Sequence, residues 1–416
     1  MFRISVLALT ASALCLGSPV RADDAEDKAV ALVKKLGGEV ARDQKAPNKP
    51  VTSVNLSFRK PTAADLKELA VFQNLTTLDL TFTGTTDAGL KALNALKNLK
   101  TLSLHGTPLT DAGLKELGAL KNLTALDLAF TGIKDADLKE LSALKNLKEL
   151  SLFGTRITDE GLKELAAFQN LASLSLGGTE VTDTGLKELA VFKSLTSLDL
   201  SSPRVTDEGL KELTALKNLT KLSLNSTKVT DTGLKELAAL KNLAALNLSY
   251  TAVTGTGFKE LAVLKELTAL DLCGAAVTGA GLKGLAPLKS LTSLNLAGTK
   301  VTDADLQELA PLKNLTDLSL NVTAISDTGL KDLTALHNLT SLELAFTEVS
   351  GAGFKQLIAL QNLTALTLGG EKITDAGLKQ LATFKNLTQL TLRKTEATDA
   401  GLNELQSALP KCKIVK

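Results

Sequence analysis

The residue types that most often do chemistry are scarce in this chain. It has two histidines, His105 and His337, three cysteines and no tryptophan among its 416 residues. A Ser–His–Asp triad, a Cys–His pair or a zinc site needs several such side chains at one place. Because the two histidines are far apart in the sequence, we expect no enzyme, no catalytic residue, no cofactor and no metal site.

Carboxylates remain as candidates for catalysis or metal binding. Asp127 and Glu149 fall in neighbouring copies of a repeated segment, and such a pair could act on a glycan. We interpret both as exposed surface charges, because nothing else in the sequence supports catalysis. The Thr-Asp-x-Gly blocks provide one carboxylate per copy, as at Asp87, whereas calcium takes several oxygens from one compact loop. We therefore expect no calcium site.

Aromatic residues are rare, yet several of them cluster. Aromatic side chains make up only 3% of the chain, and those near the N-terminal end recur at about the same place in five consecutive copies of the repeat. We predict a ligand-binding surface there, made of Phe58, Phe82, His105, Phe130 and Phe153 with Asp127 and Glu149 beside them. The alternative is that the phenylalanines pack into loops and bind nothing.

The element that positions these residues is a repeat of 24 residues. Counting from the leucine that follows each Lys-Asn pair, copies start at Leu75, Leu99, Leu123 and so on to Leu387, and the spacing never slips. Fourteen copies start in this way, and Val51 begins a divergent first one. A period of this size is typical of solenoids.

Within one copy, residues 219–242, the pattern changes from strand to helix. Two leucines alternate with polar residues, as in a strand with one buried face, and three then recur every third residue, as on one side of a short helix. These are Leu222 and Leu224 in the strand and Leu234, Leu237 and Leu240 in the helix. One copy cannot bury these leucines alone, but stacked copies can.

The residues between strand and helix suit the start of a helix. The Thr230 hydroxyl can accept a hydrogen bond from the first turn, and the Asp231 charge suits the positive helix end. Gly233 allows close backbone approach. We therefore predict an α/β fold, a right-handed solenoid shaped as a horseshoe, because helices need more lateral room than strands. Parallel strands would form its concave face and short helices its convex face.

The repeated motif Leu-x-x-Leu-x-Leu-x-x-Thr-x-Val-Thr-Asp-x-Gly-Leu-x-x-Leu resembles a leucine-rich repeat. It is most similar to the class with Thr-Asp-x-Gly-Leu blocks and Cys or Asn at the ninth position, and to exported leucine-rich-repeat proteins of the planctomycete type. The resemblance covers about residues 51–416. This chain departs from it by placing Thr at the ninth position, as in Thr83, Thr107 and Thr227. Pro203, Ala275 and Glu371 interrupt that series, and we expect irregular loops there.

The sequences at the two ends of the chain predict a signal peptide and two caps that cover the ends of the solenoid. Residues 1–22 read as a signal peptide, with Arg3 before an apolar stretch and Val20-Arg21-Ala22 before the cleavage site. Residues 23–50 form the expected N-terminal cap, with a helix over 25–36 and an edge strand over 39–43. The solenoid of about fifteen repeats spans 51–408, and 409–416 form the C-terminal cap with a last partial strand.

The charge balance and the composition restrict the kinds of molecule that the protein is expected to bind. Of 47 basic residues, Arg3 and Arg21 leave with the signal peptide, so that 45 remain against 45 acidic residues. This balance gives no long-range attraction for nucleic acid, and we expect no membrane insertion either. We predict an exported (secreted, periplasmic or cell-surface) binding scaffold that recognises a protein or glycan through its concave face. The alternative is a structural cell-envelope or matrix protein without a discrete ligand site.

Overall fold

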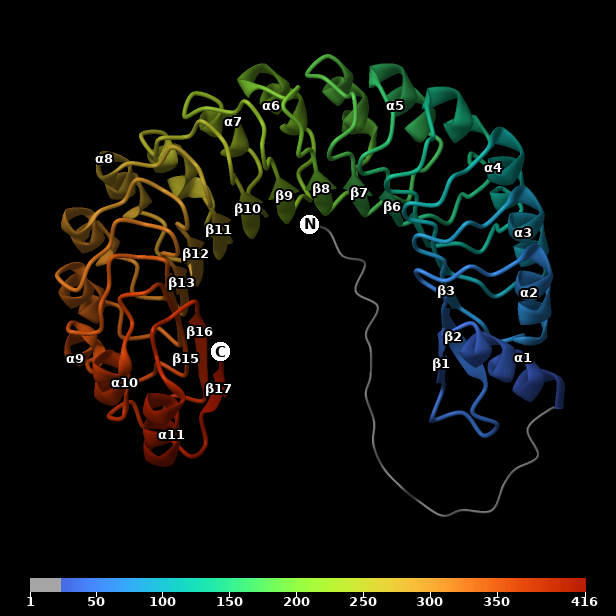
Figure 1. Ribbon diagram of the computed structural model, residues 1–416. Coiled ribbons are helices and arrows are strands. Elements are labelled where there is room, and N and C mark those ends of the chain that lie inside the picture. The colour runs from blue at the N-terminus through green and yellow to red at the C-terminus, as the bar shows by residue number, and fades with distance from the viewer. Residues whose placement is uncertain (1–23) are drawn as a thin grey trace. The chain divides into compact units, whose positions relative to one another are not determined.

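A computed structural model describes residues 24–416, and the predicted signal peptide lies outside the described part. The chain divides into two units, Met1–Asp199 and Leu200–Lys416. In each unit short strands alternate with short helices, the strands on the inner side of its curve and the helices on the outer side (Figure 1). Along the described residues, no helix combines the length and the apolar character needed to cross a bilayer.

The first unit begins with one antiparallel pair of strands and continues in parallel. Strand β1 runs antiparallel to β2, and β2 to β8 pair in parallel in chain order. The strands are β1 Glu39–Arg42, β2 Val51–Asn55, β3 Thr77–Asp79, β4 Thr101–Ser103, β5 Ala125–Asp127, β6 Glu149–Ser151, β7 Ser173–Ser175 and β8 Ser197–Asp199. The α-helices are α1 Asp24–Lys35, α2 Ala63–Glu68, α3 Asp87–Ala92, α4 Asp111–Leu117 and α5 Asp159–Leu165, and the 3-10 helices are η1 Leu69–Val71, η2 Leu93–Ala95, η3 Asp135–Lys139 and η4 Gly185–Val191.

The second unit is parallel throughout, from β9 to β17. Its strands are β9 Lys221–Ser223, β10 Ala245–Asn247, β11 Ala269–Asp271, β12 Ser293–Asn295, β13 Asp317–Ser319, β14 Ser341–Ala345, β15 Ala365–Gly369, β16 Gln389–Arg393 and β17 Lys413–Val415. The α-helices are α6 Asp207–Leu213, α7 Leu234–Leu237, α8 Gly279–Leu282, α9 Phe354–Leu357, α10 Asp375–Leu381 and α11 Asp399–Ala408, and the 3-10 helices are η5 Phe258–Val263, η6 Lys283–Leu285, η7 Asp303–Leu309 and η8 Gly329–Ala335.

The register of the sheet reproduces the sequence period. Leu78 pairs with Leu102, and Leu102 with Leu126, so each strand residue lies beside the residue 24 positions further on. The leucines of strands and helices are buried between the two layers. Six phenylalanines that replace helix leucines are buried too, as the period predicts: Phe72, Phe168, Phe192, Phe258, Phe354 and Phe384. The predicted solenoid of strands and short helices is therefore confirmed.

The Thr-Asp-x-Gly block links each repeat to the next one. The predicted threonine cap is present in some repeats, since the Thr158 hydroxyl accepts a hydrogen bond from the first turn of α5. At Thr230 it is absent, because α7 begins only at Leu234, and the Thr230 hydroxyl accepts the Thr232 N–H in the turn before the helix. The aspartate has a partner that the sequence did not predict. Asp207 accepts the N–H and the hydroxyl of Thr230, one repeat later, at 2.8 and 2.6 Å. A Cβ on Gly233 would lie 2.3 Å from Asp207 Oδ1, so glycine leaves room for the carboxylate.

Two further series of side chains, which recur once in most repeats, donate hydrogen bonds to backbone carbonyls of the turns. At the ninth position, the Thr227 hydroxyl donates to the Leu224 carbonyl at 2.7 Å. At the last position, asparagines donate to the preceding repeat, as Asn122 Nδ2 does to Lys97 O at 2.8 Å. These asparagines therefore tie each turn to the preceding repeat.

The three interrupted loops differ from one another. The loop at Ala275 keeps the usual backbone hydrogen bond, from Ala275 N–H to Leu272 O at 3.0 Å, so the irregularity expected there is absent. At Pro203 the chain has no N–H to donate, and the Arg204 N–H turns to Ser202 Oγ instead. At Glu371 the preceding strand β15 is longer, and the chain turns at Gly370 with φ of 108°.

Candidate ligand-binding surface

The predicted aromatic residues lie just beyond the carboxyl ends of the strands, where the backbone turns through the left-handed region. Phe58, Phe82 and Phe130 occupy the eighth position of their repeats with φ of 59°, 50° and 54°. Glycine holds that position in other repeats, for example Gly106 and Gly154, with φ of 65° and 67°. A residue with a side chain is disfavoured there by about 1–2 kcal/mol. The three phenylalanines thus stand where glycine would be the less strained choice.

Five rings from five successive repeats form a continuous stack, which we call the ring ladder. It comprises Phe58, Phe82, His105, Phe130 and Phe153. The ring centroids of consecutive members are 5.3, 5.0, 5.2 and 5.2 Å apart. The first pair is stacked, and the others meet edge-on or tilted, which are the favourable geometries for aromatic contacts. The structure therefore brings together all five aromatic residues that the sequence singled out.

Glycines make room for the ladder. A Cβ on Gly106 would lie 2.3 Å from the Phe82 ring, and one on Gly154 would lie 2.8 Å from the Phe130 ring. In these two repeats the ladder ring comes from the seventh position instead, as His105 and Phe153. The Phe153 ring faces Gly177, where a Cβ would lie 2.7 Å away, and the ladder ends there.

The ladder is open to solvent along one edge. Phe58, Phe82 and Phe130 are 67%, 49% and 55% exposed, whereas His105 and Phe153 are partly buried. The three phenylalanines do not enter the leucine core. They lie against neighbouring rings, and Phe82 and Phe130 also lie against Gly106 and Gly154 of the next repeat.

The two carboxylates lie differently with respect to the ladder. Asp127 Oδ2 is 3.6 Å from His105 Nδ1, and its other oxygen accepts the Ala129 N–H at 2.9 Å, which holds the side chain in place. Glu149 is exposed on β6 and pairs in register with Ala125, two residues before Asp127. Only Asp127 therefore touches the ring ladder.

The second unit has eighth-position side chains that the sequence did not single out. Tyr250 is 62% exposed, with φ of 54°, and its ring covers Gly274 as Phe82 covers Gly106. The Cys273 thiol lies 3.8 Å from the tyrosine oxygen, and this hydrogen bond raises the pKa of Tyr250 above its usual value. Val322 and Phe346 are exposed at the same position. Reading the eighth position of every repeat would have found all three.

The chemical groups of this surface are aromatic rings with one carboxylate beside them. Within residues 24–416, no group of three or more His, Cys, Asp or Glu side chains is placed to hold a metal ion. The Thr-Asp-x-Gly carboxylates, considered above for calcium, accept hydrogen bonds from the following repeat, as Asp159 does from Thr182. An exposed row of rings can instead cover an apolar surface of a partner.

Stacked strand–turn–helix units with leucines facing inward define a leucine-rich-repeat solenoid. The family model described as "leucine-rich repeat region" matches residues 51–301 and 135–357. The chain belongs to the leucine-rich-repeat family. The fold of this family is that of a protein-binding scaffold. No curated protein is significantly similar to the chain in sequence.

Several solved structures share the fold. A leucine-rich-repeat protein of Leptospira interrogans is 27% identical, with 88% of this chain and 90% of that chain covered and a TM-score of 0.57. An internalin of Listeria monocytogenes is 23% identical, with 94% of each chain covered and a TM-score of 0.53. The receptor of a TLR13–ssRNA13 complex is 21% identical, with 88% of this chain and 62% of that chain covered and a TM-score of 0.54.

Proposed function

We propose that the protein is an exported scaffold that binds a protein partner through the ring ladder. The single observation that carries this proposal is the continuous row of five rings, in which three exposed phenylalanines stand in a left-handed backbone. Strain of this kind persists only where the surrounding structure imposes it, and it gathers at functional sites. At Phe58, Phe82 and Phe130 a side chain strains the left-handed backbone, and burial of the ring within the chain compensates for little of this strain. A partner that covers the rings would explain why phenylalanine stands there.

The chemistry of the ladder indicates the kind of partner. Large aromatic side chains are the residues that contribute most to protein interfaces, and they act when a partner excludes water from them. Asp127 beside His105 adds one charged group next to the apolar strip. An apolar protein segment, flanked by a group that can hydrogen-bond to Asp127 or His105, fits this surface.

The test uses the whole mature chain as bait on the exported fraction of the native organism. N-terminal sequencing of the native protein in that fraction is expected to start at Asp23. The double variant Phe82→Gly/Phe130→Gly is expected to lose the partner captured by the wild type, with at least about a tenfold loss of affinity, because two central anchors disappear.

A matched control makes the test specific. Phe346 occupies the same left-handed position in the second unit, with φ of 58° and 43% exposure, outside the ladder. Phe346→Gly is expected to keep the partner. Equal retention by both variants would contradict the proposal and favour the structural envelope role, and capture of a glycan in place of a protein would contradict the partner class.

A further inference from the structure

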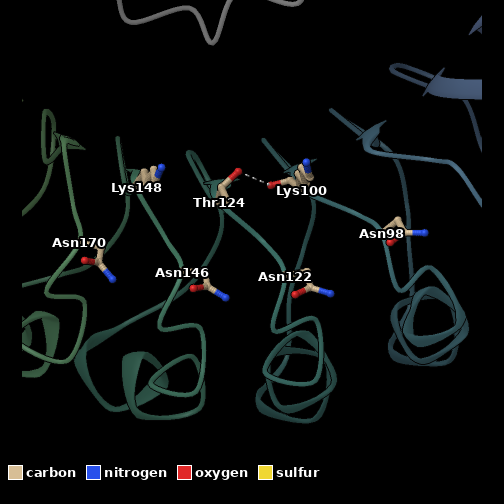
Figure 2. Close-up of a pocket in the computed structure, with 7 residues that line it drawn as sticks. All are labelled: Asn98, Lys100, Asn122, Thr124, Asn146, Lys148 and Asn170. Atoms are coloured by element: carbon tan, nitrogen blue, oxygen red, sulfur yellow. Dashed lines mark hydrogen bonds between the residues drawn. The ribbon is translucent and has the colours of Figure 1, made fainter. Parts of the chain in front are cut away.

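At the opposite end of the strands, the first unit has a groove of about 580 Å³ that is lined by asparagine, lysine and threonine side chains. It runs along the turns that lead into β4, β5, β6 and β7, whereas the ring ladder lies beyond the carboxyl ends of the strands. Its lining residues are Asn98, Lys100, Asn122, Thr124, Asn146, Lys148 and Asn170. Figure 2 shows the two lysines on the same side, with Thr124 between them and the four asparagines in a row.

The asparagines are fixed by the ladder that joins the repeats. Asn98, Asn122, Asn146 and Asn170 donate through Nδ2 to the carbonyls of Gln73, Lys97, Lys121 and Lys145 at 2.7, 2.8, 2.9 and 2.9 Å. Each amide has a second N–H and a carbonyl oxygen besides that bond. The groove therefore offers donors and acceptors in a row, one set per repeat, in orientations held before any ligand binds.

The two lysines distinguish this stretch from the other repeats. The second position of the repeat is threonine or alanine elsewhere, as at Thr76 and Ala172, but lysine at Lys100 and Lys148. The adjoining turns add Lys97, Lys121 and Lys145, against a single acidic residue, Glu149. Among the described residues, no carboxylate lies within ion-pair distance of Lys100 or Lys148, whereas helix lysines such as Lys163 have glutamate partners. The groove is therefore a local cationic site on a chain with balanced charge.

We propose that this groove binds a linear anionic polysaccharide, in a site separate from the ring ladder. Strands lie about 4.8 Å apart, so Lys100 and Lys148, two repeats apart, are separated by about 10 Å. A pyranose unit is about as long as one strand spacing, so successive sugars can meet successive asparagines while every second carboxylate or sulfate meets a lysine. In an extended acidic peptide, side chains on one face are about 6.6 Å apart, which does not match the lysines.

The experiment measures binding of the full mature chain to an oligogalacturonate of about eight units by calorimetry at low ionic strength. Lys100→Gln/Lys148→Gln is expected to weaken binding about tenfold, because two exposed charge pairs are lost, and to reduce its salt dependence. The control Lys91→Gln/Lys115→Gln removes the same charge from exposed positions on α3 and α4 and is expected to change affinity less than twofold.

Several outcomes would overturn the proposal. These are no binding of oligogalacturonate by the wild type, equal loss in the two double variants, equal binding of a neutral cello-oligosaccharide, or tighter binding of an oligoglutamate peptide. Unchanged thermal unfolding of Lys100→Gln/Lys148→Gln is required, so that a loss of binding is not a loss of fold. Phe82→Gly is expected to leave oligogalacturonate binding unchanged, which separates this site from the ring ladder.

Discussion

At the scale of single residues, the glycines and aspartates of the Thr-Asp-x-Gly block show what a one-dimensional pattern conveys and what it omits. The sequence predicts that glycine permits a close approach and that aspartate lies near a helix start. It does not tell which atom approaches, because the partner is 23 to 26 residues away. In the structure the approaching atom is the carboxylate oxygen of the preceding repeat, at Asp135 for Gly161 and at Asp207 for Gly233.

This contact predicts the effect of adding one methyl group. In Gly161→Ala the new Cβ would lie 2.3 Å from Asp135 Oδ1 and 2.8 Å from the Ile157 side chain, so the variant is expected to lose about 1–3 kcal/mol of unfolding free energy. Gly132→Ala is the matched control, because nothing lies within 4 Å of its Cβ. It is expected to be neutral or to gain up to about 1 kcal/mol. Urea unfolding compares the two, and equal stabilities would contradict the close approach.

Residue types alone predict only part of the ring ladder. The sequence grouped its five rings because they recur in consecutive repeats, and the structure stacks them. It did not foresee the left-handed backbone at Phe82, since nothing in the residue type predicts a positive φ for phenylalanine. Tyr250 was missed because it has no aromatic neighbour in the adjoining repeats.

At the scale of elements, strand length follows the residue at the fifth position of the repeat, since strands with Asp, Asn or Ser there end at that residue. Asp79, Asp127 and Asn295 accept the backbone N–H two residues later through their side chains, and their strands end at that residue. Where Glu343 or Thr367 stands there instead, β14 and β15 continue for two more residues. A side chain that bonds its own backbone competes with the sheet. The period predicts that strands exist, but their lengths follow the residue type at the fifth position, where Asp and Asn compete with the sheet in this way.

The junction between repeats also has a pH dependence that can be measured. Partial burial raises the pKa of Asp231, but hydrogen bonds from the Thr254 hydroxyl and from the backbone N–H groups of Gly257, Thr254 and Gly255 outweigh it, so the pKa is lowered. A lowered pKa in the folded state means that the ionised carboxylate stabilises the fold above its unfolded pKa. This contribution is lost as the pH falls through the folded pKa.

The test compares the unfolding free energies of the wild type and of Asp231→Asn between pH 7 and pH 3. At pH 7 the variant is expected to be the less stable protein, because an amide N–H would face the N–H donors around it. As the pH falls below the usual range of an aspartate, the difference in unfolding free energy is expected to shrink. Chemical denaturation at each pH gives this difference, and a constant or growing gap would contradict the assignment.

At the scale of the whole molecule, fold and binding rest on different residues. The inward leucines and the ladders between repeats hold each unit together, and they follow directly from the 24-residue period. The candidate surfaces come from positions where the repeat varies, namely the seventh and eighth positions for the ring ladder and the second position for the cationic groove. The period therefore predicts the architecture almost completely, while the ligands depend on the exceptions.

The central claim is that the ladder phenylalanines serve a partner and not the fold. It is tested most directly by the unfolding free energy of Phe82→Gly/Phe130→Gly in urea. The two glycines together relieve about 2–4 kcal/mol of left-handed strain, and the four lost ring contacts are worth about 2–6 kcal/mol together. The two effects largely offset each other, and at the middle of these ranges a loss of about 1 kcal/mol is expected. Phe72→Ala, in the core, is the reference and is expected to lose about 3–5 kcal/mol. A loss in the double variant as large as that reference would contradict the claim.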